Sequence, residues 1–409
     1  MRLTPSNIWL YVLPVTLMGI GLMNLYSIEN FPAPSWSSNF YRQVAWAVLT
    51  VGVMGTMSFL EGAFWRYLAY VVYGGALGLM ILTILVGREV NGARAWLELG
   101  GNRLQSSEFA KVATALALAR FLEVSPDFSW RRRRDLMVVL GLVGLPMLLA
   151  LLQKDTGTAL TFGAFLVPLY RYGMSGWIVV GPVLMGGLAM VSLVYGWKVA
   201  IGVGAILGLV GYLWWRRWEW ALLLGAALMV WAWVAPKLYE RVLAPHQRRR
   251  IEVLLDPYKD PRGSGWNVIQ VRIAIEAGGL WGRGYGQGLQ SKLDFIPQRH
   301  TDFAFCGIAE EWGWVGSTIL IGLFVGLMWV LASSAEKINS TFGLIFGYSL
   351  VGILGVHFLI NLGMILGLLP VIGIPLPFIS YGGSSWLAMG WGIGVMQRFY
   401  RERSLRLFG

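Results

Sequence analysis

The sequence predicts an all-α, polytopic membrane protein, and three features support this fold class. Of its 409 residues, 56% are hydrophobic and only 13% are charged, which is more apolar surface than a water-soluble protein of this length can bury. Apolar runs of roughly 17 to 25 residues recur along the chain, and a helix of that length crosses about 30 Å of hydrocarbon. The runs lack the short alternation of barrel strands, so the spans are expected to be helical.

The predicted spans number about 10 to 12 when hydropathy, proline and glycine breaks, and charge are combined. The first is expected to be an uncleaved span rather than a signal peptide, because no small-residue cleavage site follows it. One integral membrane domain, residues 1–409, is therefore expected. The spans are placed at residues 8–27, 43–60, 67–87, 108–124, 136–153, 157–173, 177–196, 199–215, 219–236, 311–333, 341–366 and 383–398.

The charge pattern predicts the orientation of these spans. With an even number of spans and a cytoplasmic N-terminus, the basic segments 130–135, 216–219 and 398–406 all fall inside, as the positive-inside rule requires. Both termini are then cytoplasmic, and the loop 237–310 is extracytoplasmic. That loop is basic too, but loops longer than about 60 residues are largely exempt from the rule. The positive-inside rule explains most of the basic residues that give the net charge of +12. Nucleic acid is therefore not an expected partner.

Two further segments are more than simple connections. Residues 87–111, GREVNGARAWLELGGNRLQSSEFAK, are polar and rich in glycine and run directly into a helix that carries Glu108 and Lys111. Residues 367–385, GLLPVIGIPLPFISYGGSS, hold three prolines in an apolar setting and are too broken for a spanning helix. Irregular backbone is tolerated at membrane depth only where it packs on protein or lines a cavity, so this segment is expected to be re-entrant or interfacial.

Ionisable side chains at membrane depth are candidates for function, because burying them without a partner is costly. Glu108 and Lys111 stand three residues apart on one helix face, so they form either a structural ion pair or a substrate-contacting pair. Asp155 stands between two spans, directly before Thr-Gly-Thr. A carboxylate there can accept backbone N–H groups as a helix cap, which is the simpler interpretation, and substrate binding is the other.

The loop 237–310 is the part of the chain richest in reactive side chains. It combines carboxylates, Arg, Lys and many glycines with an apolar, helix-like piece at 268–276. Cations suit phosphate, carboxylates suit sugar hydroxyls, and one carboxylate could act as a base, so the loop fits an anionic, polyoxygenated head group. A solvated cap with ion-paired charges is the simpler alternative. The sequence has no motif of nucleotide hydrolases, zinc hydrolases or nucleophile-elbow enzymes, and its three histidines lack metal-ligand spacing.

Several motifs, in order, resemble the signature of the SEDS family of shape, elongation, division and sporulation proteins. The segment DPYKDPRGSGWNVIQVRIAIEAGGLWGRGYGQGLQSKLDFIPQRHTDFAF carries the main likeness, followed by EEWGWVG and the 367–385 segment. Upstream, GARAWLELGGNRLQSSEFAK is similar to the family's G-A-x-R-W…Q-P-S-E-x-x-K segment, and LLQKDTGTAL to its Q-P-D-x-G-T-A segment. The I-A-I-x-x-G-G and R-H-T-D-F details are closer to the elongation branch, RodA, than to the division branch, FtsW.

The resemblance implies a peptidoglycan glycosyltransferase of the bacterial inner membrane that serves cell elongation and rod-shape maintenance. Its implied substrate is lipid II, the undecaprenyl-diphosphate-linked disaccharide-pentapeptide, and its implied partner is a class B penicillin-binding protein transpeptidase. No cofactor is certain; a divalent cation could help to stabilise the diphosphate, although the sequence shows no dedicated cage for one. The predicted spans exceed the number typical of the family, so the Trp-rich segment 198–236 would be an extra transmembrane hairpin.

The resemblance also implies site residues. The family's catalytic aspartate, in its D-P-x-G-x-G segment, corresponds to Asp260, and Asp256 matches a less decisive position. Departures from the family pattern leave the acid and its turn in place; they occur at Ser106, Lys154, Trp266 and Gln298. The substrate-binding residues that the resemblance implies are Arg94, Trp96, Glu108, Lys111, Asp155, Gly263, Gly265, His300, Asp302 and Ser380.

Within this scheme, Asp260 is expected to act as a general base in a single displacement that inverts the anomeric carbon. Lys111, Arg94 and the arginines at 248–250 are expected to stabilise the departing diphosphate. Two alternatives from other classes stay open. A flippase for lipid-linked precursors predicts functional residues spread through the helical bundle, and a non-catalytic scaffold for a transpeptidase needs only packing surfaces.

Overall fold

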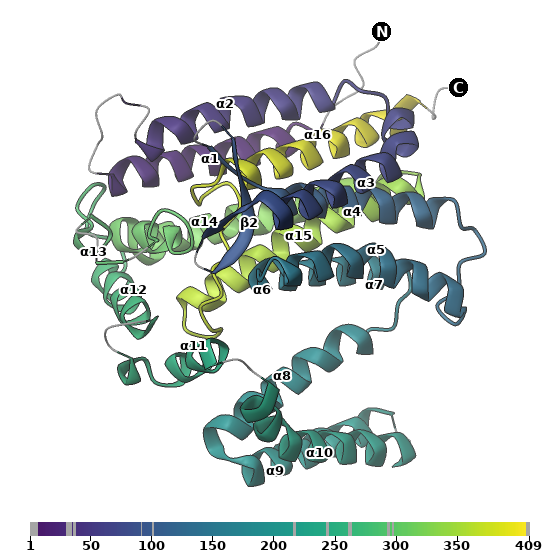
Figure 1. Cartoon of the computed structure of the whole chain (residues 1–409), viewed down its shortest axis with the longest axis vertical. Coiled ribbons are helices and arrows are strands. Elements are labelled where there is room, and N and C mark those ends of the chain that lie inside the picture. Colours follow the sequence, from purple (N-terminus) through teal and green to yellow (C-terminus); the bar gives the residue numbers. More distant parts are fainter. Residues whose placement is uncertain are drawn as a thin grey trace. The chain divides into compact units, whose positions relative to one another are not determined.

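The computed structural model describes residues 7–29, 35, 38–90, 92–99, 102–215, 218–242, 245–260, 264–292, 295–296 and 298–405. The chain forms two compact units, Met1–Tyr172 with Asn267–Gly409 and Gly173–Trp266. Figure 1 labels the α-helices of both units and strand β2. The helices are α1 (Trp9–Ile28), α2 (Asn39–Met57), α3 (Gly62–Val86), α4 (Ser106–Glu123), α5 (Arg133–Leu152), α6 (Thr156–Thr161), η1 (Phe162–Phe165), α7 (Leu166–Arg171), α8 (Trp177–Tyr195), α9 (Trp197–Trp215), α10 (Trp218–Val242), α11 (Pro245–Leu255), η2 (Pro257–Lys259), α12 (Ser264–Gly278), α13 (Leu289–Lys292), α14 (Ala304–Glu336), α15 (Thr341–Ile365) and α16 (Gly383–Leu405).

Helical structure lies over each predicted span, and the protein is a multi-pass membrane protein. Among the described residues, seven helices are long and apolar enough to cross a membrane: α1, α3, α5, α8, α10, α14 and α15. α4 is not one of them, because its 18 residues include four charged ones, Glu108, Lys111, Arg120 and Glu123. The prediction of an all-α polytopic protein is therefore confirmed.

The predicted span at 157–173 is interrupted in the structure. α6 passes into the short 3₁₀ turn η1 and then into α7. Pro168 has no N–H to donate to the carbonyl of Ala164, so the helical hydrogen-bond ladder fails at this point. α15 packs closely on the same carbonyl: a Cβ on Gly352 would stand 2.2 Å from Ala164 O, which only glycine avoids. The interrupted helix is therefore also the place where α15 packs closely on η1.

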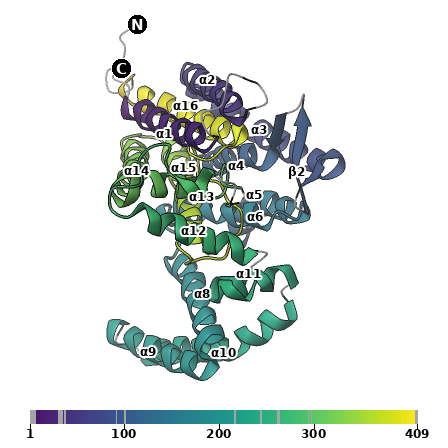
Figure 2. The same cartoon turned by 90° about the vertical axis from the view of Figure 1, so that its left-hand side faces the viewer.

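The segment before α4 forms a small sheet that the sequence analysis did not predict. β1 (Arg88–Val90), β2 (Ala93–Leu99) and β3 (Asn102–Gln105) pair antiparallel in the order β1-β2-β3. In β2 the side chains of Ala95 and Leu97 are buried, whereas Arg94 and Glu98 are exposed, as expected for a strand with one covered face. Figure 2 shows the strands beside α3 at the edge of the first unit. The all-α description thus omits one β element.

α15 and α4 form the centre of the first unit. Most positions of α15 are buried, and this helix packs against α14, α4 and α7. α16 lies along α2, as Figure 1 shows, and a Cβ on Gly394 would approach Met54 O to 2.5 Å. Small residues of this kind let helix backbones approach closely, which is how membrane helices associate without a strong hydrophobic driving force between them.

The segment between α15 and α16 has the irregular, buried backbone that the sequence predicted. Ile374, Leu376 and Phe378 are almost fully buried, and the connection contains no regular helix before Gly383. Phe378 holds a positive φ of 65°, a conformation that a bulky residue adopts only where surrounding contacts impose it. This segment packs on protein, as the rule for irregular backbone at membrane depth requires.

The ends of the first unit can be told apart by their contacts. At one end, polar contacts join the start of α3, the end of α4 and the C-terminal parts of α7, α14 and α16. These contacts are Arg66–Glu123 at 3.1 Å, Gly62–Glu402 at 2.7 Å and Arg171–Glu336 at 2.7 Å. At the opposite end, the sheet and the irregular segment meet, and Tyr381 N–H donates to His300 O at 2.7 Å. Loop segments with polar side chains therefore gather opposite the α16 terminus.

The second unit is built on α8, α9 and α10. α9 and α10 run side by side as a helical hairpin, visible in Figure 2. A Cβ on Gly204 would stand 3.3 Å from the backbone of Leu228, and Ser192 Oγ donates to Ala232 O at 2.7 Å. Leu188, Ala200 and Leu228 belong to the buried core of this unit. The hairpin coincides with the segment 198–236 that the sequence analysis singled out.

The glycine-rich loop 279–288 packs against the first turns of α14. The N–H groups of Arg283 and Gly284 donate to the carbonyls of Glu310 and Glu311 at 3.0 Å and 3.0 Å. Gly282 has φ +82°, and a Cβ there would stand 2.1 Å from Glu311 O. These glycines therefore let the loop pack closely against the backbone of α14.

Gly282→Ala is expected to destabilise the protein by about 2 to 5 kcal/mol, because it adds left-handed strain to a clash with fixed backbone. Gly279→Ala is the matched control: its φ is +52°, but no atom lies within 4 Å of its Cβ position, so it should cost only about 1 to 2 kcal/mol. The measurement is the thermal midpoint of each variant in detergent. Equal midpoints for the two variants would contradict the contact with α14.

Candidate functional site

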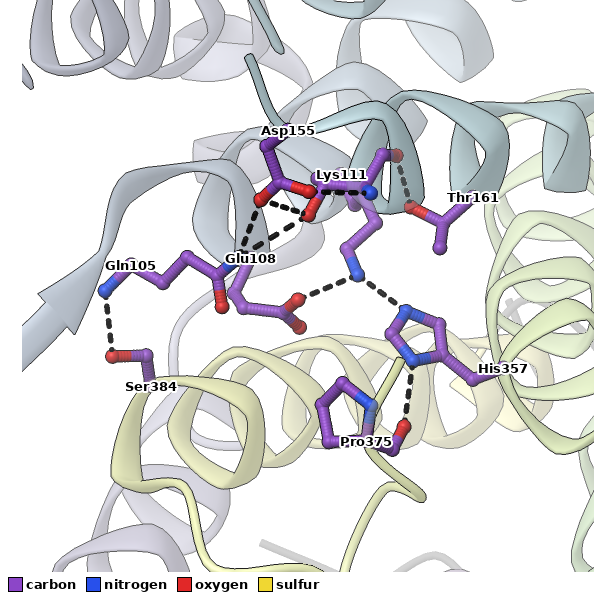
Figure 3. Close-up of polar contacts among 9 residues, drawn as sticks. Gln105, Glu108, Lys111, Asp155, Thr161, His357, Pro375 and Ser384 are labelled. Atoms are coloured by element: carbon purple, nitrogen blue, oxygen red, sulfur yellow. Dashed lines mark hydrogen bonds and ion pairs between the residues drawn. The ribbon is translucent and has the colours of Figure 1, made fainter. Parts of the chain in front are cut away.

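Glu108, Lys111 and His357 form a buried ionic cluster in the first unit (Figure 3). Lys111 Nζ lies 2.8 Å from Glu108 Oε1 and 2.5 Å from His357 Nε2. Both members of the ion pair are almost inaccessible, with exposed side-chain fractions of 1% for Lys111 and 4% for Glu108. The first turns of α4 place Glu108 and Lys111 on one face, and α15 supplies the imidazole.

The imidazole also connects this cluster to the irregular segment. His357 Nδ1 lies 3.0 Å from Pro375 O, and that carbonyl can only accept a hydrogen bond. Nδ1 therefore carries the proton, which leaves Nε2 as the acceptor from the Lys111 ammonium. The cluster joins α4, α15 and the 367–385 segment through charged and polar groups alone.

A second polar group lies beside the first (Figure 3). Asp155 caps α6: its Oδ1 accepts from Thr158 N–H at 2.9 Å and its Oδ2 from Thr158 Oγ1 at 2.6 Å. Gln105 Nε2 donates to Asp155 Oδ2 at 3.2 Å, and Gln105 N–H donates to Ser384 Oγ at 3.0 Å. The cap expected for Asp155 is confirmed, and this carboxylate also ties β3 to α6.

Asp155→Ala is expected to lower the stability by about 0.5 to 2 kcal/mol, the usual cost of losing a helix cap. Asp155→Asn should retain most of the stability, because the amide oxygen can still accept from Thr158 N–H. Thermal midpoints of the two variants measure the difference. Equal losses for Ala and Asn would contradict the capping role and indicate that the negative charge itself matters.

Arg94 and Trp96 lie on the sheet. Arg94 N–H donates to Gln153 O at 2.9 Å, and its guanidinium lies 3.5 Å from Glu89 with 56% of the side chain exposed. Trp96 is partly buried, and its backbone pairs with Gln105 in β3. The sheet thus brings these two residues next to the segment that starts α4.

Ser380, His300 and Asp302 lie together where the irregular segment meets residues 298–303. Ser380 Oγ donates to Thr301 O at 2.5 Å and accepts from Leu376 N–H at 2.9 Å. Asp302 is buried, and its carbonyl accepts from Asn361 Nδ2 at 2.8 Å. The Ser380 hydroxyl therefore acts within the protein, where it fastens the irregular segment to the end of the long loop.

Asp260 lies at the end of η2 in the second unit. Its carboxylate makes a two-point contact with Arg249, with Nη2–Oδ1 at 2.8 Å and Nε–Oδ2 at 3.0 Å. This contact raises the pKa of Arg249, mainly through the hydrogen bonds to Asp260 and also through the carboxylate charge. Asp256 caps the same turn by accepting from Tyr258 N–H at 3.1 Å. The two aspartates thus have different roles in one turn.

Gly265 completes this turn. A Cβ on Gly265 would stand 2.1 Å from Pro257 O and 2.6 Å from Asp260 O, so the first turn of α12 approaches η2 as only glycine allows. Gly263, the other glycine of the turn, lies outside the described residues. Gly265 therefore serves the packing of the turn that carries Asp260.

Sequence reasoning missed the partners of the predicted residues. His357 and Gln105 complete the polar contacts of Lys111 and Asp155, and Arg249 had no assigned partner among the loop arginines. An imidazole inside an otherwise apolar span needs a polar partner, and that signal could have linked His357 to the nearby charged pair. Within the described part of the chain, no group of three or more His, Cys, Asp or Glu side chains is placed to hold a metal ion.

The sequence matches the family model described as cell cycle protein, FtsW/RodA/SpoVE, over residues 7–202 and 197–405. The chain belongs to this family. It is 32% identical to the peptidoglycan glycosyltransferase RodA of Treponema pallidum, over 95% of this chain and 97% of that protein. It is 34% identical to the peptidoglycan glycosyltransferase MrdB of Escherichia coli, over 80% of this chain and 76% of that protein.

Solved structures of family members have the same fold. A chain from a peptidoglycan synthase complex that coordinates polymerization and crosslinking matches with a TM-score of 0.68 and 32% identity, over 97% of this chain and 98% of that chain. The rod shape determining protein RodA of Thermus thermophilus matches with a TM-score of 0.63 and 28% identity, over 97% of each chain. The family resemblance seen in the motifs is confirmed over nearly the whole length.

Proposed function

We propose that this protein is a peptidoglycan glycosyltransferase of the bacterial inner membrane that polymerises lipid II into glycan strands during cell elongation. The observation that carries this proposal is the match to glycosyltransferases named RodA and MrdB over 95% and 80% of the chain. The Asp260 turn adds a chemical reason, because Asp260 ends η2 and its carboxylate remains partly accessible, with 12% of the side chain exposed.

Asp260 is the proposed general base. As the acceptor's sugar hydroxyl attacks the anomeric carbon of the donor, its proton passes to the Asp260 carboxylate. The bond between that carbon and the diphosphate oxygen breaks, and the lipid diphosphate leaves with the electron pair. One displacement of this kind inverts the anomeric centre and gives a β linkage from an α-linked donor. General-base help typically contributes about 10²- to 10⁴-fold to the rate.

The proposed orientation places both termini in the cytoplasm and the 237–310 loop outside, where a flipped lipid-linked sugar arrives. Two observations support it. In the first unit, the start of α3 and the ends of α4, α7, α14 and α16 lie at one end and are joined there by polar contacts. The irregular segment, the sheet and the end of the long loop meet at the other. The α9–α10 hairpin adds two crossings and so leaves this orientation unchanged.

The proposed partner is a class B penicillin-binding protein transpeptidase. Support comes from the solved neighbour, whose chain belongs to a synthase complex that couples polymerization to crosslinking. A glycan strand is useful to the cell wall only once it is crosslinked, so the two activities belong together. The proposal also allows a divalent cation beside the diphosphate, where it would stabilise the negative charge.

The proposal is tested with purified protein in detergent, lipid II, and the transpeptidase present or absent. Glycan polymer on a gel is the expected product, and its absence under both conditions would contradict a polymerase. A flippase is the alternative, because Glu108 and Lys111 are charges inside the helical bundle. Sealed vesicles separate the two: a flippase moves labelled lipid II across the bilayer without joining sugars, whereas a polymerase joins sugars in detergent, where no bilayer exists.

A further inference from the structure

Arg249 occupies both oxygens of the carboxylate that is proposed to act as the base. The two contacts measure 2.8 Å and 3.0 Å, the parallel geometry in which a guanidinium binds a carboxylate most strongly. The two side chains differ in their surroundings: 63% of Arg249 is exposed, whereas 12% of Asp260 is. Asp260 is largely covered and its backbone N–H donates to Pro257 O, whereas the exposed Arg249 side chain can move away.

This contact conflicts with catalysis. A carboxylate oxygen that already accepts a hydrogen bond from a guanidinium is less available to accept a proton, and arginine does not give up its own proton. Each carboxylate oxygen keeps a second lone pair, so Arg249 does not block proton uptake outright, but its charge favours the ionised form. Asp260 therefore becomes the stronger base once Arg249 has released at least one oxygen. The guanidinium of Arg249 is exposed, so an anion that offers the same two-point geometry can compete with Asp260 for it.

The donor carries such an anion. The fork of a guanidinium matches phosphate oxygens as well as it matches a carboxylate. We propose that Arg249 exchanges Asp260 for the diphosphate of the lipid-linked donor, so that donor binding itself frees the base. This inference rests on the proposed function. In the occupied enzyme Arg249 neutralises the diphosphate as the glycosidic carbon–oxygen bond breaks and the electron pair moves to the leaving oxygen, while Asp260 takes the hydroxyl proton.

The exchange makes a specific prediction for binding. Asp260→Asn removes the charge that competes for Arg249, so this variant should bind undecaprenyl diphosphate several-fold more tightly than the wild type. Arg249→Gln should weaken the same binding about 10-fold, because it removes a charge-assisted contact. Lys259→Gln is the matched control: Lys259 is exposed and adjacent to Asp260, and it should leave the affinity within about twofold.

The experiment measures tryptophan fluorescence of the full-length protein in detergent during titration with undecaprenyl diphosphate. Inorganic pyrophosphate should compete weakly, whereas phosphatidylglycerol at the same concentration should not compete, which separates a diphosphate site from attraction to any anionic lipid. Kinetics with lipid II add a second readout. Arg249→Lys keeps the charge but loses the fork, so it should raise KM by about 10-fold with a smaller change in kcat. Thermal midpoints confirm that each variant is folded.

Three results would overturn the exchange: equal or weaker binding by Asp260→Asn, unchanged binding by both Arg249 variants, or full competition by phosphatidylglycerol. These results are independent of polymerase activity. If the variants bind as expected but the wild type makes no polymer, the proposed function fails and the diphosphate site stands. If the wild type makes polymer but Asp260→Asn binds no more tightly, the exchange is wrong and the proposed function stands.

Discussion

Asp260→Asn is expected to lower glycan polymerisation from lipid II by at least about 100-fold, because general-base catalysis contributes about 10²- to 10⁴-fold. The asparagine keeps the size of the side chain and can still accept a hydrogen bond from Arg249, but it cannot take up the hydroxyl proton. The turn should therefore remain folded. The measurement is the initial rate of lipid II consumption, with size-exclusion chromatography and capture of the transpeptidase as checks on folding.

Asp256→Asn is the matched control for this result. Asp256 accepts from Tyr258 N–H at 3.1 Å, and the oxygen of asparagine can make the same cap. This variant should keep its activity within about threefold of the wild type. Polymerisation at the wild-type rate by Asp260→Asn would contradict the general-base role. An equal loss in both variants would instead indicate that the turn had collapsed.

Lys111→Met is expected to destabilise the protein by about 3 to 5 kcal/mol. Lys111 is 1% exposed, and it is the cation beside Glu108, whose side chain is 4% exposed. Removing the ammonium leaves a buried carboxylate without its counter-charge and leaves His357 Nε2 without its donor. The thermal midpoint in detergent measures the loss. A midpoint equal to that of the wild type would contradict the burial and pairing described for this cluster.

The double variant Glu108→Gln with Lys111→Met separates structure from substrate contact. Replacing a whole buried ion pair is often neutral, so the double variant should regain most of the stability lost by Lys111→Met alone. If the pair is purely structural, polymerase activity should return together with stability. If either group contacts lipid II, activity should stay low while stability recovers. This cycle decides between the two interpretations that the sequence left open.

The positions of the helices could be predicted from the sequence, because each depends on a local property, the length of an apolar run, although only seven of the described helices are long and apolar enough to cross a membrane. The bounds agree closely for most of them; the predicted 341–366 span, for example, is the helix Thr341–Ile365. The irregular segment 367–385 was also predictable, since its prolines and glycines act locally. The family motifs likewise placed the Asp260 turn, and the Asp256 cap of that turn follows from the residue type.

What the sequence did not predict depends on contacts between distant residues. The sheet at 88–105 was missed because its alternation covers only a few residues between glycines, and strand pairing is decided by the partner strand. The Lys111–His357 contact joins residues 246 positions apart, and no periodicity relates them. The Arg249–Asp260 pair spans two elements whose packing the sequence leaves open. In each case the residue type was visible but the partner was not.

A single assay that compares the purified wild type with Asp260→Asn tests the glycosyltransferase activity and its catalytic base together. Both are incubated with lipid II and the transpeptidase partner, and the products are separated on a gel before and after digestion with a muramidase that cleaves β linkages. If Asp260 is the general base, the wild type should give a ladder of glycan strands that the muramidase removes, and Asp260→Asn should give no ladder. A wild-type preparation that binds its partner but leaves lipid II unpolymerised, or an equal ladder from both proteins, would contradict this expectation.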